Sequence, residues 1–174
     1  LAAVIAIEIV GMLSIMIIAC IMDSPLIGIL YFIISIPLKV TAGGYHAPTY
    51  GKCFLISNLE YIALSLTAKA FSASFMPYYG WIILLMVSAV YILLNCPVRN
   101  PNHPISEDVL LKNRRLTYLL LGIDTVVITL LYLLLQESYL LNFSVLSIAA
   151  IAIFILPTKK RKEDNFHDCS VYSE

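Results

Sequence analysis

Six long apolar blocks separated by short polar connections constrain this chain more than any other feature of its sequence. The blocks cover residues 1–22, 24–40, 53–71, 79–95, 116–136 and 139–157. A helix of about 20 apolar residues crosses the hydrocarbon core of a bilayer. In lipid only helices and closed barrels satisfy their own backbone, and the alternating polarity of barrel strands is missing. The sequence predicts an all-α integral membrane protein, a single domain over residues 1–174 with a bundle of about six transmembrane helices.

The second block is the least regular, because Pro25 and Pro37 bracket its apolar core. A short segment of this kind fits a tilted span, a span that borrows flanking residues, or a re-entrant segment. We favour a span. With six spans, both termini lie on the same face of the membrane.

Composition excludes most soluble classes. Hydrophobic residues make up 60% of the 174 residues and charged residues only 13%, whereas a soluble domain carries roughly 25% charged residues. The formal net charge is zero. A nucleic-acid partner would need a basic surface, so none is expected.

The basic residues are unevenly placed along the chain. Of the 11 Lys and Arg residues, all but Lys69 fall in the connection 39–53, the connection 96–115 or the tail 158–174. These three regions share one face in a six-span topology. By the positive-inside rule that face, with both termini, is cytoplasmic. We expect the tail, with its run Lys159–Lys162, to contact anionic lipid headgroups.

The connection 39–53 is the one polar stretch that indicates chemistry. It places His46 seven residues before Cys53, a separation of roughly 10 Å on a continuous helix. Gly43, Gly44 and Pro48 break such a helix and allow the connection to fold back. A cysteine at the start of the third helix gains from the macrodipole, and with an imidazolium nearby its reactive thiolate fraction rises. Free N–H groups there suit a developing oxyanion.

Other interpretations of these residues stay open. Free cysteines often pack in cores, and a Gly-Gly turn between spans is an ordinary connection. The protein would then be a non-enzymatic transporter subunit or scaffold. Cys96 also precedes His103 by seven residues, so two Cys and two His form a possible zinc set. Zinc-site spacings are usually shorter, and we expect no metal and no cofactor. A disulfide framework is not expected in the cytoplasm.

The stretch Gly43-Gly44-Tyr45-His46-Ala47 followed by Cys53 resembles the signature of the accessory gene regulator B (AgrB) family. These are membrane cysteine endopeptidases that process quorum-sensing propeptides in Firmicutes. A second stretch, Cys96-Pro-Val-Arg-Asn-Pro-Asn-His-Pro-Ile105 with the basic run up to Arg115, is similar to the P-V-x-x-x-N-x-P-I connection of that family.

The resemblance implies a function and its residues. Cys53 matches the nucleophile of the family, His46 its partner histidine, and Lys39 a basic residue that is usually Arg. The implied reaction cleaves an AgrD-like autoinducing-peptide precursor through an acyl-enzyme and closes a thiolactone or lactone ring. The resemblance also implies a homodimer in the cell membrane of a Gram-positive bacterium, with the site facing the cytoplasm.

Further residues have supporting roles in this prediction. Glu60 follows Cys53 by seven residues and so lies on nearly the same helical face. An unpaired carboxylate within a span costs roughly 2.5 to 3.5 kcal/mol, so Glu60 is expected to face the bundle or a wet cavity. Gly43 and Gly44 shape the connection. Lys112, Arg114 and Arg115 either bind an acidic propeptide tail or only orient the neighbouring span.

Overall fold

The computed structural model describes residues 2–43, 47, 49–72, 77–98, 106–135 and 139–171. This part of the chain is helical, which confirms the predicted all-α class. The elements are α1 (Ala2–Ile21), α2 (Pro25–Leu30), the π-helix η1 (Tyr31–Ser35), α3 (Ile36–Ala42), α4 (Tyr50–Ser72), α5 (Tyr78–Asn95), α6 (Glu107–Leu135) and α7 (Tyr139–Val171). Since α2, η1 and α3 follow one another without a break, they form one helical rod. The eight elements therefore make six rods.

Three of these rods are long and apolar enough to cross a membrane: Pro25–Ala42, Tyr78–Asn95 and Glu107–Leu134. Two shorter apolar helices, Ile9–Ile21 and Tyr139–Ile155, accompany them. Large aliphatic side chains cover the outside of the bundle. Leu94 and Leu134, for example, are 79% and 78% exposed. A soluble protein rarely exposes so much contiguous apolar surface, so this surface is suited to lipid.

The second predicted span is a continuous helix despite its proline. Pro37 has no N–H, and its ring would collide with the carbonyl four residues earlier in a regular α-helix. The chain widens into the π-turn of η1 immediately before it, where the Ile36 N–H donates to the Tyr31 carbonyl. π-bulges are a common way to relieve such a conflict. The result is an 18-residue rod, Pro25–Ala42, and not a re-entrant turn.

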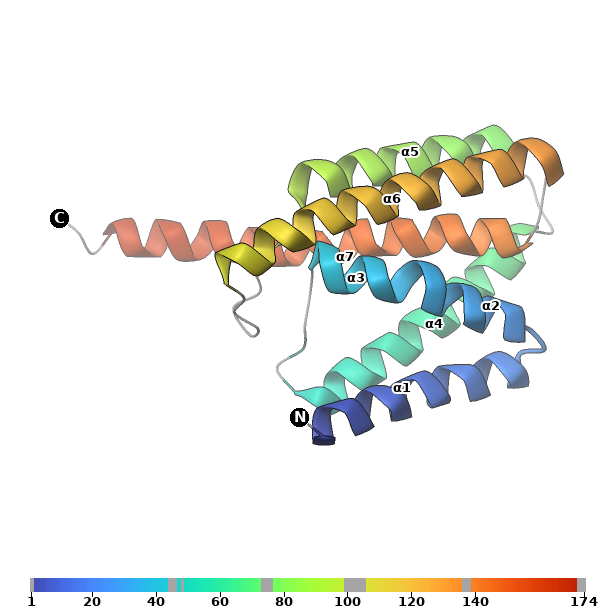
Figure 1. Ribbon diagram of the computed structural model, residues 1–174, viewed down its shortest axis with the longest axis horizontal. Coiled ribbons are helices and arrows are strands. Elements are labelled where there is room, and N and C mark those ends of the chain that lie inside the picture. Colours follow the sequence, from blue (N-terminus) through green and yellow to red (C-terminus); the bar gives the residue numbers. More distant parts are fainter. Residues whose placement is uncertain are drawn as a thin grey trace.

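The rods run up and down, so that alternate connections lie at opposite ends of the bundle (Figure 1). One end of the bundle holds the start of α1, the end of α3, the start of α4, the end of α5, the start of α6 and the C-terminal end of α7. Lys39 is in the last turn of α3, Lys52 in the first turn of α4 and Lys112 in the second turn of α6, all at this end, whereas Lys69 is in the last turn of α4 at the other. The predicted charge asymmetry is therefore present in the described residues.

Helix α7 lies between two groups of helices and joins their cores (Figure 1). One cluster packs Leu38 of α3 with Trp81 of α5, Tyr132 of α6 and Ile148 of α7. The other contains residues of α1, α2, η1, α4 and α7: Ile15, Ala19, Ile27, Tyr31, Tyr61, Ala68 and Phe143. The end of α3, where the chemistry-bearing connection begins, belongs to the first cluster through Leu38 and Ala42.

A backbone contact ties that connection to the one after α5. Gly43 forms a parallel β-bridge with Val98, whose N–H donates to the Ala42 carbonyl at 3.0 Å. Gly43 has φ +72° and ψ −169°, a region open almost only to glycine. A Cβ added there would lie 2.5 Å from the Val98 carbonyl oxygen. Gly43 is thus required both by its own conformation and by the close approach of Val98.

Candidate functional site

Cys53 lies in the first turn of α4, as predicted. Thr49 precedes the helix, its carbonyl accepts the Cys53 N–H at 3.1 Å, and its hydroxyl accepts the Lys52 N–H at 3.4 Å. The N–H groups of Tyr50 and Gly51 at the helix start are therefore the ones left without intrahelical acceptors. The Cys53 side chain is partly exposed. Its thiol is accessible while it stays within the positive field of the helix N-terminus.

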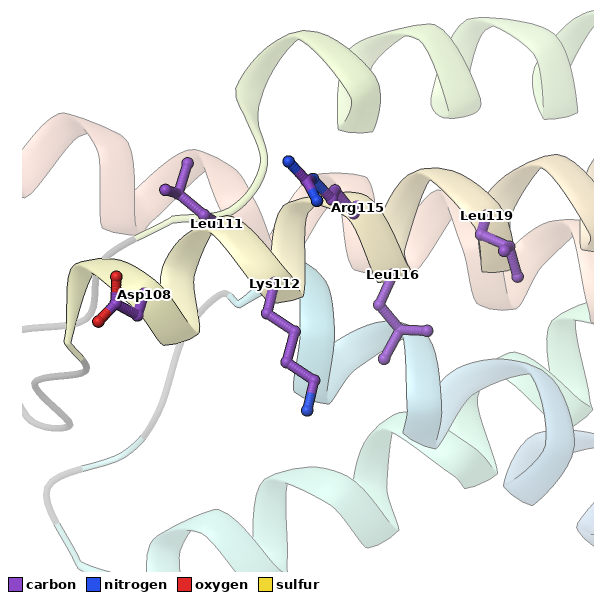
Figure 2. Close-up of a pocket in the computed structure, with 6 residues that line it drawn as sticks. All are labelled: Asp108, Leu111, Lys112, Arg115, Leu116 and Leu119. Carbon is purple, nitrogen blue, oxygen red and sulfur yellow. The ribbon is translucent and has the colours of Figure 1, made fainter.

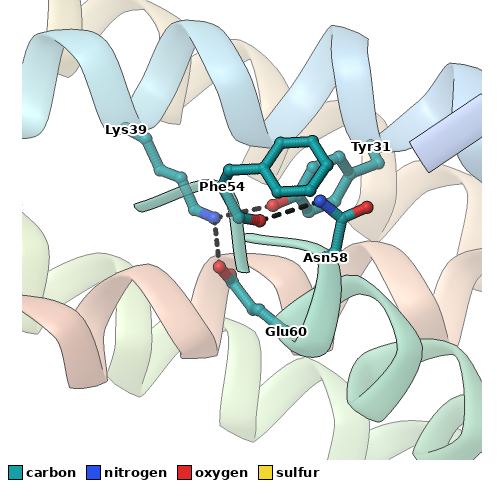
Figure 3. Close-up of polar contacts among 5 residues, drawn as sticks. All are labelled: Tyr31, Lys39, Phe54, Asn58 and Glu60. Atoms are coloured by element: carbon teal, nitrogen blue, oxygen red, sulfur yellow. Dashed lines mark hydrogen bonds and ion pairs between the residues drawn. The ribbon is translucent and has the colours of Figure 1, made fainter. Parts of the chain in front are cut away.

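A charged cluster joins the neighbouring rod to α4 (Figure 3). The Lys39 ammonium donates to Glu60 Oε2 at 2.5 Å and to the Tyr31 hydroxyl at 2.8 Å. The side chains of Lys39 and Glu60 are 26% and 8% exposed. Burial of an ion costs free energy unless a counter-ion and hydrogen bonds compensate it. Lys39 supplies that compensation for Glu60, as expected for a carboxylate in an apolar segment.

An aromatic ring of α7 also lies near the ammonium. The Lys39 nitrogen is 5.7 Å from the centre of the Phe154 ring, and it is 5.0 Å from the centre of the Tyr31 ring, whose hydroxyl it contacts. Tyr31 packs edge-on against Tyr61 and Phe143, with ring centres 5.5 and 6.3 Å apart. Cation–π attraction to Phe154 and the packed aromatic support of Tyr31 both restrict the position of the ammonium.

Polar contacts also fix α4 beside Cys53. The Asn58 amide donates to the Phe54 carbonyl at 2.8 Å, and its oxygen accepts the Ser14 hydroxyl of α1 at 2.7 Å.

The second carboxylate oxygen of Glu60, Oε1, is buried and has no hydrogen-bond partner within the described part of the chain. The charge of Glu60 therefore depends on Lys39 for its compensation.

Two of the predicted site residues fall outside the described residues: His46 and Gly44. The structure describes the other four: Lys39 lies on α3, Gly43 is the C-cap of α3, and Cys53 and Glu60 lie on α4. Sequence reasoning had placed Glu60 on the helical face of Cys53 but had not paired it with Lys39. It had also missed Tyr31, although a spacing of eight residues puts Tyr31 on the same helical face as Lys39.

The other described cysteines differ from Cys53 in their surroundings. Cys20 is exposed on α1. Cys96, which follows α5, is buried, and burial raises the pKa of its thiol to about 11. A thiol with such a pKa is almost entirely protonated at neutral pH. No group of three or more metal-binding side chains comes together among the residues described; His46 and His103 of the possible zinc set lie outside them.

The three basic residues of α6 separate into two groups. Arg114 donates to the Tyr118 hydroxyl at 2.8 Å, which in turn donates to the Leu93 carbonyl at the end of α5. Lys112 and Arg115 instead border an open hollow of about 500 Å³ (Figure 2). Its other described lining residues are Asp108, Leu111, Leu116 and Leu119, all on α6. Arg114 thus joins two helices, whereas Lys112 and Arg115 border open space.

Fold and site together define a polytopic helical membrane protein with an accessible cysteine at a helix N-terminus, close to a buried ion pair. The accessory gene regulator B (AgrB) family model matches residues 2–156, and the chain belongs to this family. It is thus a membrane protein involved in processing quorum-sensing peptides, in a family of peptidases that act on AgrD. Neither the curated proteins nor the solved structures give a significant match.

Proposed function

We propose that the chain is a cysteine endopeptidase that removes the C-terminal segment of an AgrD-like propeptide and cyclises the remainder. Cys53 is the nucleophile and His46 the general base and acid. The observation that carries this proposal is the position of Cys53, which is partly exposed in the first turn of α4. A transporter or scaffold has no need of a thiolate at this place.

The first step forms a thioester. His46 takes the proton from Cys53, and the thiolate sulfur attacks the carbonyl carbon of the scissile peptide bond. The N–H groups of Tyr50 and Gly51, which have no acceptor within α4, stabilise the negative oxygen. As the carbon–nitrogen bond breaks, His46 returns the proton to the leaving amine. The C-terminal segment departs, and the rest of the propeptide stays attached to Cys53.

The second step closes the ring. A Cys or Ser within the bound peptide loses its proton to His46 and attacks the thioester carbon, which forms a thiolactone or lactone. The Cys53 sulfur leaves and recovers a proton from His46. Water would instead release a linear peptide, so the site must exclude it during this step.

The substrate is proposed to reach the site from the cytoplasm. The end of the bundle that carries Cys53 also carries Lys39, Lys52 and Lys112, and basic ends face the cytoplasm. Lys112 and Arg115, which border an open hollow, are suited to an acidic part of the propeptide. A homodimer in the cell membrane of a Gram-positive bacterium completes the proposal.

Reconstitution of the full chain in lipid vesicles with a propeptide that contains an internal Cys tests this function. Mass spectrometry should detect a released C-terminal segment and a cyclic product that is one water lighter than the linear acid. Cys53→Ala and His46→Ala should abolish both products, while Cys20→Ala should leave them unchanged. Undiminished processing by Cys53→Ala would refute the proposal.

A further inference from the structure

The half of α4 that carries Cys53 is held in place differently from the other half. Tyr61 and Ala68 of the second half pack in the core cluster around Tyr31. Neither core cluster takes a side chain from Tyr50–Glu60 in the part of the chain that the structure describes. In Figure 1 the start of α4 lies beside α1 and away from α7. Apolar packing in the core therefore does not fix the helix end that bears the thiol.

Contacts with α1 take the place of that packing. Asn58 is 7% exposed and is the only fully buried residue within Tyr50–Glu60. Its amide oxygen accepts the Ser14 hydroxyl of α1 at 2.7 Å, and its amide nitrogen donates to the Phe54 carbonyl at 2.8 Å (Figure 3). A Cβ added at Gly11 would lie 3.9 Å from the Phe54 ring, so α1 passes close to the first turns of α4. A chain of two hydrogen bonds thus connects α1 to the backbone of these turns.

An asparagine at this position needs an explanation beyond packing. Its helix propensity is low, and a buried amide costs free energy unless its oxygen and its nitrogen both find partners. An apolar side chain would pack against α1 without that cost. A hydrogen bond differs from apolar contact because it restricts direction as well as distance, and polar side chains link helices in this way within membranes. The contact between Ser14 and Asn58 therefore indicates that the two helices need a defined relative position.

We propose that Ser14 and Asn58 form a hydrogen-bonded clasp through which α1 sets the position of Cys53. Both are positioning residues that act through Cys53. The inference rests on the proposed role of Cys53 as the nucleophile. It makes α1 a part of the catalytic apparatus, because the correct placement of the sulfur depends on it.

The geometry of α4 gives the size of the expected effect. Tyr61, where α4 enters the core, lies eight residues after Cys53, roughly 12 Å along the helix axis. A tilt of the first half of α4 by about 5° around Tyr61 therefore moves Cys53 by about 1 Å. A misplacement of about 1 Å slows an enzyme by up to roughly 10²-fold. Loss of the clasp leaves the ion pair between Lys39 and Glu60 in place, so we expect a loss of about tenfold.

The experiment uses the full chain in lipid vesicles and a propeptide whose ring-forming Cys is replaced by Ala. Release of the C-terminal segment then occurs in a burst. The rate constant of the burst reports the attack by Cys53, and its amplitude reports the fraction of the protein that is active. Asn58→Leu removes both hydrogen bonds with a side chain of similar size, and Ser14→Ala removes only the bond between the helices. Each should lower the rate constant by about tenfold and leave the amplitude unchanged.

Three further variants separate positioning from folding. Ser14→Thr keeps the hydroxyl and should restore most of the wild-type rate constant. Thr67→Val is the matched control on α4, since it removes a hydroxyl that donates to the Ala63 carbonyl of the same helix at 2.7 Å, and its rate constant should equal that of the wild type. The double variant Ser14→Ala/Asn58→Leu should be no slower than Asn58→Leu, because both substitutions break the same bond.

A lower rate constant at unchanged amplitude in Ser14→Ala, with recovery in Ser14→Thr, supports the clasp. A wild-type rate constant in Ser14→Ala, a lower amplitude alone, or equal slowing in Thr67→Val overturns it. A purely structural role would change how much protein is active and not how fast each molecule reacts. If Asn58→Leu does not fold, Ser14→Ala still decides. If Cys53→Ala abolishes the burst while Ser14→Ala reacts at the wild-type rate, only this inference fails. If Cys53→Ala retains the burst, the proposed function fails.

Discussion

Gly43→Ala tests whether the contact between the two connections shapes the site. Gly43 has φ +72° and ψ −169°, and a Cβ would lie 2.5 Å from the Val98 carbonyl oxygen. Real Cβ atoms do not approach a backbone oxygen so closely, so either α3 or the segment after α5 must move. The substitution should therefore separate Gly43 from Val98.

The cost follows from two contributions. A non-glycine residue held in this backbone region costs about 1–3 kcal/mol. Displacement of Val98 also lengthens its hydrogen bond to the Ala42 carbonyl, now 3.0 Å, and a typical hydrogen bond contributes about 0.5–1.5 kcal/mol. The sum of about 2–4 kcal/mol corresponds to a fall in Tm of roughly 5–15 °C for a chain of this size.

Thermal unfolding in detergent, followed by the fluorescence of the buried Trp81, measures this effect. Gly51→Ala is the matched control, because Gly51 lies in the first turn of α4 and a Cβ there meets nothing within 4 Å. Alanine favours a helix, so Gly51→Ala should match or slightly exceed the wild-type Tm. A Gly43→Ala protein as stable as Gly51→Ala would refute the reasoning.

Three other predictions concern single side chains. Cys96 should react with iodoacetamide at pH 7.5 at least tenfold more slowly than Cys53, because Cys96 is buried and its pKa is raised to about 11; peptide mapping checks this, and equal rates would contradict it. Lys39→Met should lower the free energy of unfolding by roughly 3 kcal/mol, because Glu60 then loses its counter-ion. The double variant Lys39→Met/Glu60→Gln should regain much of this loss, and thermal unfolding measures both. Lys112→Gln should raise KM for an acidic propeptide severalfold with kcat unchanged in steady-state assays, and the difference should shrink in high salt; a fall in kcat alone would exclude a binding role.

Much of the fold could be predicted because lipid imposes simple rules on sequence. Blocks of about 20 apolar residues and the grouping of lysine and arginine gave the all-α class and the up-and-down order. The π-turn at Tyr31–Ser35 could not be predicted, although Pro37 is visible in the sequence. Where a helix widens depends on the helices that pack against it, and the neighbour of η1 from another rod is α7, which lies more than 100 residues further along the chain.

The site could be predicted only in part for a similar reason. Helical periodicity placed Glu60 on the face of Cys53. Its partner Lys39 is 21 residues away on another rod, and no local rule selects that pair. Gly43 was expected to let the connection turn, but its contact with Val98 depends on how α3 and α5 end side by side. Arg114 and Tyr118, spaced four apart, are one pair that local reasoning could have found.

The most direct test of the central claim is to trap the acyl-enzyme. A propeptide whose ring-forming Cys is replaced by Ala can donate its acyl group but cannot cyclise. Intact-mass measurement of the quenched enzyme should show an adduct of the mass of the N-terminal fragment. Peptide mapping should place it on Cys53, and hydroxylamine should remove it as it does a thioester. Release of the C-terminal segment with no adduct on Cys53, or with the adduct on another residue, would contradict the account.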